Sequence, residues 1–228
     1  MPTIAQQRPR SLLQEAMVVA AAGAIIGAWL EGDGRWLHWI CKPLATALIL
    51  RLAWTPAPIS ARYRRWIGAG IACSLAGDIC LMLPADLFAA GLACFLIAHV
   101  CFLAALAGDA RLGVRPLPWL VCLAIGALDL WLLWPALPGP LRAPVIIYVA
   151  ALAGMTGQAW ARARWHAAMG DSLAVAARRA AAGAGLFMLS DGLLAWDRFM
   201  APLPLAMLWI LASYYAALWL IARSVARA

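Results

Sequence analysis

The chain has 228 residues, of which 66% are hydrophobic and only 12% are charged, and its formal net charge is +8. This composition, with a mean hydropathy of +0.85, lies outside the soluble range and indicates an integral membrane protein. Because one crossing takes roughly 20 apolar residues, about eight to ten crossings would fill the chain, which excludes a soluble enzyme, a receptor with its own ligand-binding domain and a protein that recognises a nucleic-acid groove.

Apolar runs bounded by proline, glycine and charge predict eight membrane-spanning helices in a single transmembrane domain, residues 1–228. In chain order, the expected spans are 13–30, 36–54, 66–83, 87–107, 117–134, 143–161, 179–196 and 202–222. Glu15 lies near the start of the first run, which we expect to be a retained helix and not a signal peptide. The stretch from Arg162 to Arg179 is predicted to be the longest loop, an amphipathic segment on the headgroups. The predicted fold class is an all-α polytopic bundle.

Arginine placement predicts the orientation of these helices. Arginines gather in alternate gaps, at Arg8 and Arg10, at Arg62, Arg64 and Arg65, at Arg111 and Arg115, at Arg162, Arg164, Arg178 and Arg179, and at Arg223 and Arg227. Because arginine-rich loops stay on the cytoplasmic side, both termini are expected in the cytoplasm. The alanine- and arginine-rich composition is typical of bacteria with GC-rich genomes, so we expect the bacterial inner membrane. The arginines form no block or stripe, and no nucleic-acid partner is expected.

Ionisable residues inside the spans are the candidate functional residues, because each costs roughly 2.5–3.5 kcal/mol on insertion. They are Lys42, Asp78, His99, Asp129 and Asp191, to which Tyr148 and Tyr214 add hydroxyl groups. On the predicted topology, Lys42, Asp78, Asp129, Tyr148 and Asp191 share one depth in the outer third of the bilayer. This shared depth predicts one cavity that opens to the outer leaflet.

Several of these residues also have structural interpretations. Lys42 can snorkel to the outer headgroups, and Asp129, near Trp131 and Trp134, can be interfacial. His99 can serve as an interhelical hydrogen-bond donor. Asp78 can simply pair with Lys42 between helices. These alternatives stay open at the level of the sequence.

Two short segments suggest an internal repeat. Residues 77–81 read Gly-Asp-Ile-Cys-Leu and residues 190–194 read Ser-Asp-Gly-Leu-Leu, on the third and seventh spans. They predict two four-helix halves of the same orientation, with Asp78 and Asp191 at equivalent positions across a pseudo-twofold axis. Such a pair in a cavity would share one proton.

The chain resembles the YhhN/TMEM86 family of polytopic membrane proteins, known as lysoplasmalogenases, over roughly residues 40–222. The matching pieces are Lys42-Pro43, Gly77-Asp78 with Leu81 and Met82, Phe88, Gly91-Leu92, Phe95 and His99, Tyr148 with Met155, Phe187, Ser190-Asp191 with Phe199, and Ser213-Tyr214-Tyr215. Two departures stand out. The family usually has a glutamine where Ala217 and Leu218 occur, and a tyrosine often follows the histidine where this chain has Phe102 nearby.

The resemblance implies that a lysophospholipid from the bilayer is the substrate. The reaction would hydrolyse the vinyl ether bond of a lysoplasmalogen to a fatty aldehyde and glycerophosphoethanolamine or glycerophosphocholine. Protonation of the alkene gives an oxocarbenium ion that water attacks, which suits a proton-donating and an ionised carboxyl group. The predicted catalytic residues are Asp78 and Asp191, and the predicted substrate-binding residues are Lys42, His99, Tyr148, Tyr214 and Ser190. Membrane lipids are the other expected partners.

Other functions remain open. A metal-dependent lipid hydrolase of the ceramidase type would need histidine ligands, but His38, His99 and His166 fall at different depths and the six cysteines lack metal-site spacing. We therefore expect no metal and no cofactor. A proton-coupled transporter also uses intramembrane aspartates and would have helices broken by glycine or proline beside them. A non-catalytic lipid-binding protein would tolerate loss of either aspartate, and a related lysophospholipid is an alternative substrate.

Overall fold

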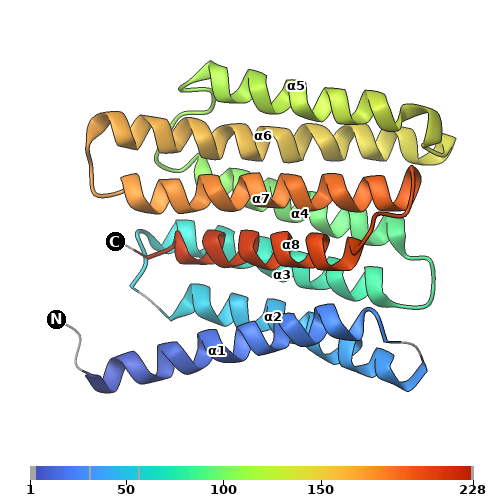
Figure 1. The fold of residues 1–228 in the computed structure, drawn as a ribbon. Coiled ribbons are helices and arrows are strands. Elements are labelled where there is room, and N and C mark those ends of the chain that lie inside the picture. The colour runs from blue at the N-terminus through green and yellow to red at the C-terminus, as the bar shows by residue number, and fades with distance from the viewer. Residues whose placement is uncertain (1–3, 31, 56, 227–228) are drawn as a thin grey trace.

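The computed structural model describes residues 4–30, 32–55 and 57–226, and these residues form an all-helical bundle without a strand (Figure 1). The helices are α1 (Ile4–Gly27), α2 (Arg35–Trp54), α3 (Ala61–Met82), α4 (Phe88–Leu106), α5 (Pro116–Leu133), α6 (Gly139–Met169), α7 (Ala174–Phe199) and α8 (Ala206–Arg223). Short 3-10 helices at Gly32–Gly34 and Trp134–Ala136 precede α2 and follow α5. The predicted all-α fold class is confirmed. Three of the arginines used to predict the topology are not described in full: the side chains of Arg8 and Arg10, and the whole of Arg227, lie outside the described part of the chain.

Within the described chain, five helices are long and apolar enough to cross a membrane: α3, α4, α5 with its 3-10 extension, α6 and α8. The described part of α1 has a shorter apolar stretch at Leu12–Gly27. The helices α2 and α7, which hold Lys42 and Asp191, are as long but more polar. Large apolar side chains such as Trp131 (70% exposed) face outward, as expected for a surface in contact with lipid.

The predicted loop from Arg162 to Arg179 is wrong. The helix α6 continues to Met169, Gly170 ends it with a left-handed φ of 62°, and α7 begins at Ala174. The helix continues because two of its basic residues, Arg162 and His166, have carboxylate partners within the protein. Arg162 is fully buried and donates two hydrogen bonds of 2.6 Å to Asp109 in the α4–α5 loop.

The same end of α6 is tied to the turn that follows it. His166 is buried and its Nδ1 lies 2.7 Å from a carboxylate oxygen of Asp171. This hydrogen bond lowers the pKa of the exposed Asp171 carboxyl group below its ordinary value. The backbone N–H of Leu173 donates to the other oxygen of Asp171 at 2.9 Å. The carboxylate therefore bridges the end of α6 and the start of α7.

The helices repeat one contact pattern twice. In the first half, α1 packs on α2, α2 on α3 and α3 on α4; in the second half, α5 packs on α6, α6 on α7 and α7 on α8. Between the halves, α2 packs on α8 and, correspondingly, α4 packs on α6. Raising each helix number by four, and counting on from α8 to α1, converts these contacts into one another, whereas the contacts of α1 and α3 with α8 have no counterpart of similar extent. This agrees with the predicted two four-helix halves.

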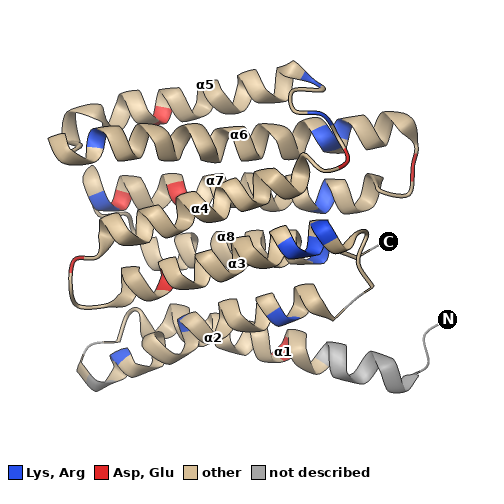
Figure 2. Ribbon diagram, turned by 180° about the vertical axis from the view of Figure 1, so that it is seen from behind, with Lys and Arg blue, Asp and Glu red and all other residues tan. Residues whose placement is uncertain are grey.

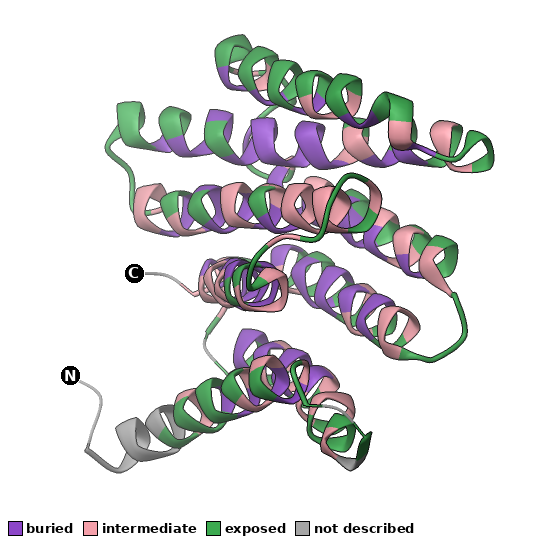
Figure 3. Cartoon of the chain, turned by 45° about the vertical axis from the view of Figure 1, so that its right-hand side comes forward, coloured by how far each residue is buried: buried purple, intermediate pink, exposed green. Residues whose placement is uncertain are grey.

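Charge and burial are distributed unevenly over the bundle. The chain enters α1 and leaves α8 at one end of the bundle (Figure 1), and most of the basic residues, all of them arginines, gather at that same end (Figure 2). The helix α5 lies at the edge and is mostly exposed, whereas the neighbouring α6 is buried along its middle, from Leu152 to Ala159, and exposed at its ends (Figure 3). In the interior, Gly183 lets α7 approach α8, since a Cβ there would lie 2.8 Å from the carbonyl oxygen of Ala217.

Candidate active site

Asp78 lies at the centre of a buried polar cluster between α2, α3 and α8. Its Oδ2 accepts hydrogen bonds of 2.7 Å from the hydroxyl groups of Thr46 and Tyr214, and its Oδ1 lies 3.7 Å from Nζ of Lys42. Lys42 is buried, so it does not snorkel to the headgroups and the interhelical pairing with Asp78 is confirmed. Sequence reasoning missed Thr46, although it lies one helical turn after Lys42 on the same face.

Asp191 lies in a second cluster between α4, α6 and α7. The hydroxyl group of Tyr148 donates to its Oδ2 at 2.5 Å, and Nε2 of His99 lies 3.6 Å from the same oxygen. His99 is fully buried, and its ring packs edge-on against Tyr148 and Phe187 at centroid distances of 5.0 and 4.9 Å. Neither nitrogen of His99 has a hydrogen-bond partner among the described residues. The predicted hydrogen bond from His99 to another helix is therefore absent there.

The two clusters correspond under the repeat. Asp78 on α3 takes its partners from α2 and α8, and Asp191 on α7 takes its partners from α6 and α4. Each carboxylate accepts a hydrogen bond from one tyrosine. Among the described residues, however, no hydrogen bond or ion pair joins the two carboxyl groups, and they share no partner.

An aromatic side chain lies between the clusters instead. The ring of Phe187 packs edge-on against Tyr214, the partner of Asp78, at a centroid distance of 5.6 Å, and also against His99 at 4.9 Å. Phe95 adds to this layer at 6.2 Å from Phe187. The prediction of one close carboxylate pair that shares a proton finds no support in this geometry.

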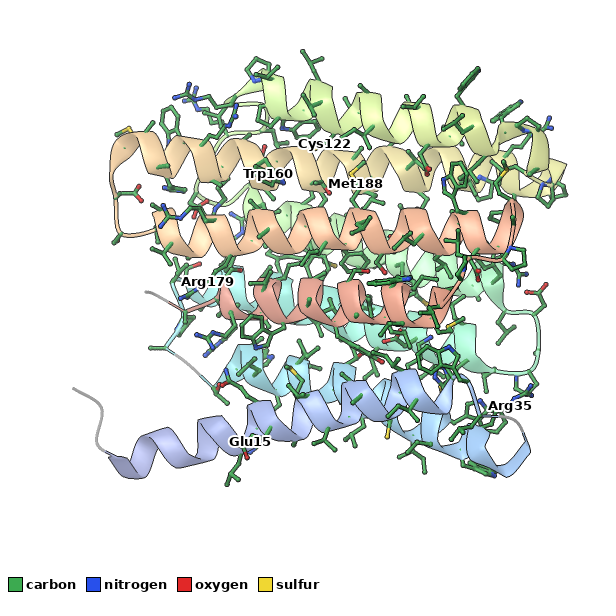
Figure 4. All side chains as sticks on the ribbon, in the orientation of Figure 1. Glu15, Arg35, Cys122, Trp160, Arg179 and Met188 are labelled. Atoms are coloured by element: carbon green, nitrogen blue, oxygen red, sulfur yellow. The ribbon has the colours of Figure 1, made fainter. Side chains whose placement is uncertain are left out.

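A large apolar cavity of about 880 Å³ reaches only the second cluster. Side chains of α4, α5, α6 and α7 line it, and the three that are labelled in Figure 4 are Cys122 on α5, Trp160 on α6 and Met188 on α7. Asp191 and Tyr148 line the cavity, whereas Asp78 does not. The polar residues predicted to share one cavity are therefore divided between a cavity wall and a closed cluster.

The cavity is long and open on one side. Along α6 its lining runs from Val145 to Arg164, which at 1.5 Å per residue is roughly 28 Å, about the thickness of a hydrocarbon core. Two lining residues, Ile125 on α5 and Leu189 on α7, are 52% and 53% exposed. A lipid chain could therefore enter the cavity from the bilayer between α5 and α7.

Three other predicted residues have clear positions. Tyr214 belongs to the Asp78 cluster and lies outside the cavity lining. Ser190, expected to bind substrate, donates its hydroxyl hydrogen to the carbonyl oxygen of Ile210 at 3.0 Å and does not line the cavity. Asp129, which we considered interfacial, does line it and accepts a 2.6 Å hydrogen bond from Nε1 of Trp196.

The features expected of the two competing site types are missing from the described residues. There, no three histidine, cysteine or acidic side chains come together as a set of metal ligands. His38 instead bonds to the carbonyl oxygen of Ala24, and His166 to Asp171. The helices α3 and α7 run unbroken past Asp78 and Asp191, in contrast to the interrupted helices expected of a transporter.

The YhhN family model matches residues 37–225 of the chain. The chain belongs to the YhhN family. It is 35% identical to human lysoplasmalogenase TMEM86B over 204 residues, which cover 87% of this chain and 80% of that protein. It is also 32% identical to the lysoplasmalogenase of Mycobacterium bovis over 166 residues, 64% of this chain and 63% of that protein.

A further YhhN relative is described as a membrane protein. The uncharacterized membrane protein YhhN of Escherichia coli O157:H7 is 31% identical over 144 residues, 59% of this chain and 68% of that one. Together with the apolar helices, this likeness makes the chain an integral membrane protein. No solved structure matches the chain.

The two departures from the YhhN pattern lie away from the cavity. Ala217 and Leu218 are fully buried, and Ala217 lies where α7 and α8 approach closely at Gly183. Phe102 is almost fully buried and packs against Phe187 at a centroid distance of 6.3 Å. None of the three residues lines the cavity, so the departures affect helix packing and leave the cavity wall unchanged.

Proposed function

We propose that this YhhN protein hydrolyses the vinyl ether bond of lysoplasmalogens to a fatty aldehyde and a glycerophosphoethanolamine or glycerophosphocholine. The observation that carries the proposal is the buried carboxyl group of Asp191, held by Tyr148 in the wall of a cavity long enough for a lipid chain. The lysoplasmalogenase names of the human and mycobacterial relatives support the choice of substrate.

The length of the cavity on either side of Asp191 orients the substrate. From Tyr148 to Arg164 the lining extends 16 residues along α6, roughly 24 Å, whereas from Asp191 to Phe199 it extends only eight residues along α7, roughly 12 Å. A 16-carbon chain is about 20 Å long, given C–C bonds of about 1.5 Å. The chain therefore lies on the Arg164 side, and the glycerol and headgroup lie on the Phe199 side.

In this position, Asp191 acts as a general acid and then as a general base. Protonated Asp191 gives its proton to the alkene carbon distal to the ether oxygen, and the adjacent carbon becomes part of an oxocarbenium ion. The carboxylate left behind stabilises that cation and accepts a proton from the water that attacks it. The resulting hemiacetal collapses, with proton transfer to the ether oxygen, to the aldehyde and the glycerol hydroxyl group.

Tyr148 and Asp78 support this reaction in different ways. Because Tyr148 bonds to Oδ2 of Asp191, it directs the other carboxylate oxygen to the substrate. Asp78 is a positioning residue, since it joins α3 to α2 and α8 through Lys42, Thr46 and Tyr214. It lies outside the cavity lining.

The arrangement of charges supports an orientation in the membrane. The end of the bundle that is rich in arginine, where α1 begins and α8 ends, is the expected cytoplasmic end (Figure 2). Both termini would then be cytoplasmic, in the bacterial inner membrane. The Phe199 end of the cavity would face the opposite leaflet, which agrees with the outer depth predicted for Asp191.

The test is aldehyde release by the purified protein in detergent, with three lysophospholipids that differ only at the first chain: vinyl ether, saturated alkyl ether and ester. We expect aldehyde from the vinyl ether alone, because the alkyl ether has no alkene carbon to protonate. In D₂O, with immediate borohydride trapping, the aldehyde should carry one deuterium next to its carbonyl carbon. Cleavage of the ester alone, or aldehyde without deuterium, would overturn the proposal.

A further inference from the structure

The cavity contains a second carboxyl group that the proposed chemistry does not use. Asp129 on α5 and Trp196 on α7 both line the cavity, and Nε1 of Trp196 donates to Oδ1 of Asp129 at 2.6 Å. This bond fixes the orientation of the indole. A carboxylate has acceptor sites on both oxygens, and Asp129 has no other hydrogen-bond or ion-pair partner among the described residues. Asp129 therefore keeps acceptor capacity beside the cavity.

Charge is distributed unevenly along the cavity. Its only charged lining residues in the described chain are Asp129, Asp191 and Arg164. Arg164 lies at the far end, roughly 24 Å along α6 from Tyr148. The end on which the headgroup lies thus has the carboxylate of Asp129 and no cation among its lining residues. Arg198, which stacks on the lining Phe88, is paired with Asp86. That end therefore favours a positively charged group.

The spacing fits the headgroup of a lysoplasmalogen. Trp196 follows Asp191 by five residues on α7, a rise of roughly 7.5 Å. Nine bonds separate the ether oxygen from the nitrogen of ethanolamine or choline, which allows a reach of up to about 12 Å at about 1.3 Å per bond. With the vinyl ether at Asp191, the ammonium group can therefore reach Asp129 and Trp196.

We propose that Asp129 and Trp196 form a binding site for the ammonium group of the substrate headgroup. The carboxylate supplies the opposite charge, and the indole ring supplies a face on which primary and quaternary ammonium groups both bind. This inference rests on the proposed function, because the position of the vinyl ether at Asp191 sets the distance. It makes the protein selective for zwitterionic lysolipids over anionic ones.

The test compares two vinyl ether substrates, an alkenyl glycerophosphocholine and the alkenyl glycerol phosphate that lacks the ammonium group. The variant Asp129→Asn removes the charge but keeps an oxygen that can accept the bond from Trp196. We expect the ratio of kcat/KM for the choline substrate to kcat/KM for the phosphate substrate to fall about tenfold or more, mainly through KM. Glu15→Gln, at an exposed carboxyl group on α1 far from the cavity lining, is the control and should leave the ratio unchanged.

A binding measurement separates this inference from the proposed function. The saturated alkyl ethers of the same two headgroups cannot be cleaved, and their Kd values can be obtained by titration of the purified protein. Asp129→Asn should weaken binding of the choline ether selectively, whether or not the wild type releases aldehyde. An equal change for both headgroups, or no change, would overturn the ammonium site; absence of aldehyde from every wild-type reaction would overturn the proposed function alone.

Discussion

Gly185 on α7 offers a way to shorten the cavity without touching the residues at the chemistry. It lies six residues before Asp191, roughly 9 Å along the helix, on the side that holds the chain. A Cβ at this position would meet only Nε1 of Trp160, at an ordinary 3.6 Å, so the backbone has room for a side chain. Gly185→Leu would narrow the cavity at the depth that about the seventh carbon of the chain reaches, counted from Asp191 at about 1.3 Å per carbon.

The expected effect depends on chain length. The substrate comes from an apolar micelle or bilayer, so burial of its chain in the cavity contributes little to the binding free energy. The effect of Gly185→Leu on binding is therefore steric. Forcing a chain past an inserted side chain costs about 1–3 kcal/mol, which is roughly a 5- to 150-fold loss of kcat/KM for a 16-carbon substrate. A substrate of six carbons should keep its wild-type kcat/KM, and Gly185→Ala should change neither value much.

Aldehyde release from a series of vinyl ether lysolipids of 6 to 18 carbons measures this directly. The loss should begin between about six and ten carbons and persist at all greater lengths. A uniform loss at every length would mean that Gly185→Leu disturbs the helix and not the chain. An unchanged profile would mean that the chain does not lie along this part of the cavity.

Three further predictions concern stability, measured by thermal unfolding in detergent. Asp78→Ala leaves a buried Lys42 without its partner and should destabilise the protein by about 3–5 kcal/mol, and adding Lys42→Met should recover part of that loss. Arg162→Met should cost a similar amount, because it leaves Asp109 without its two hydrogen bonds; a change below about 1 kcal/mol would contradict the buried pairing. The lowered pKa of Asp171 means that its carboxylate stabilises the fold above its unfolded pKa of about 3.9 and loses this effect as the pH falls. The Tm difference between wild type and Asp171→Asn should therefore be complete at pH 7, shrink as the pH falls below about 4, and vanish only below the lowered pKa of the folded state.

The apolar runs predicted the positions of the helices well. In lipid the backbone N–H and C=O groups of an apolar segment can bond only to one another, so each apolar run forms a helix of about its own length. The exception was the end of α6. Arg162 appeared to belong to a loop because its partner, Asp109, lies 53 residues earlier in a different connection. A hydropathy value treats every arginine as exposed to water, so it cannot recognise a buried arginine whose charge is neutralised by a distant carboxylate.

The site was predicted less completely, for a geometric reason. Depth along a helix follows from counting residues, but the side of the helix that faces a cavity depends on packing. Asp78 and Asp191 have the same expected depth, yet one belongs to a closed cluster and the other to a cavity wall. Thr46 could have been found from its spacing to Lys42, whereas the layer around Phe187 depends on contacts between distant segments.

The central claim is that Asp191 is the acid that protonates the vinyl ether. The most direct test is the rate of aldehyde release by Asp191→Asn beside Asp197→Asn, a matched change on the same helix at a carboxyl group outside the cavity lining. With both variants folded as the wild type, Asp191→Asn should lose roughly 10²- to 10⁴-fold in kcat, the range typical of a general acid, and Asp197→Asn should remain close to the wild type. Turnover by Asp191→Asn within tenfold of the wild type would contradict the account.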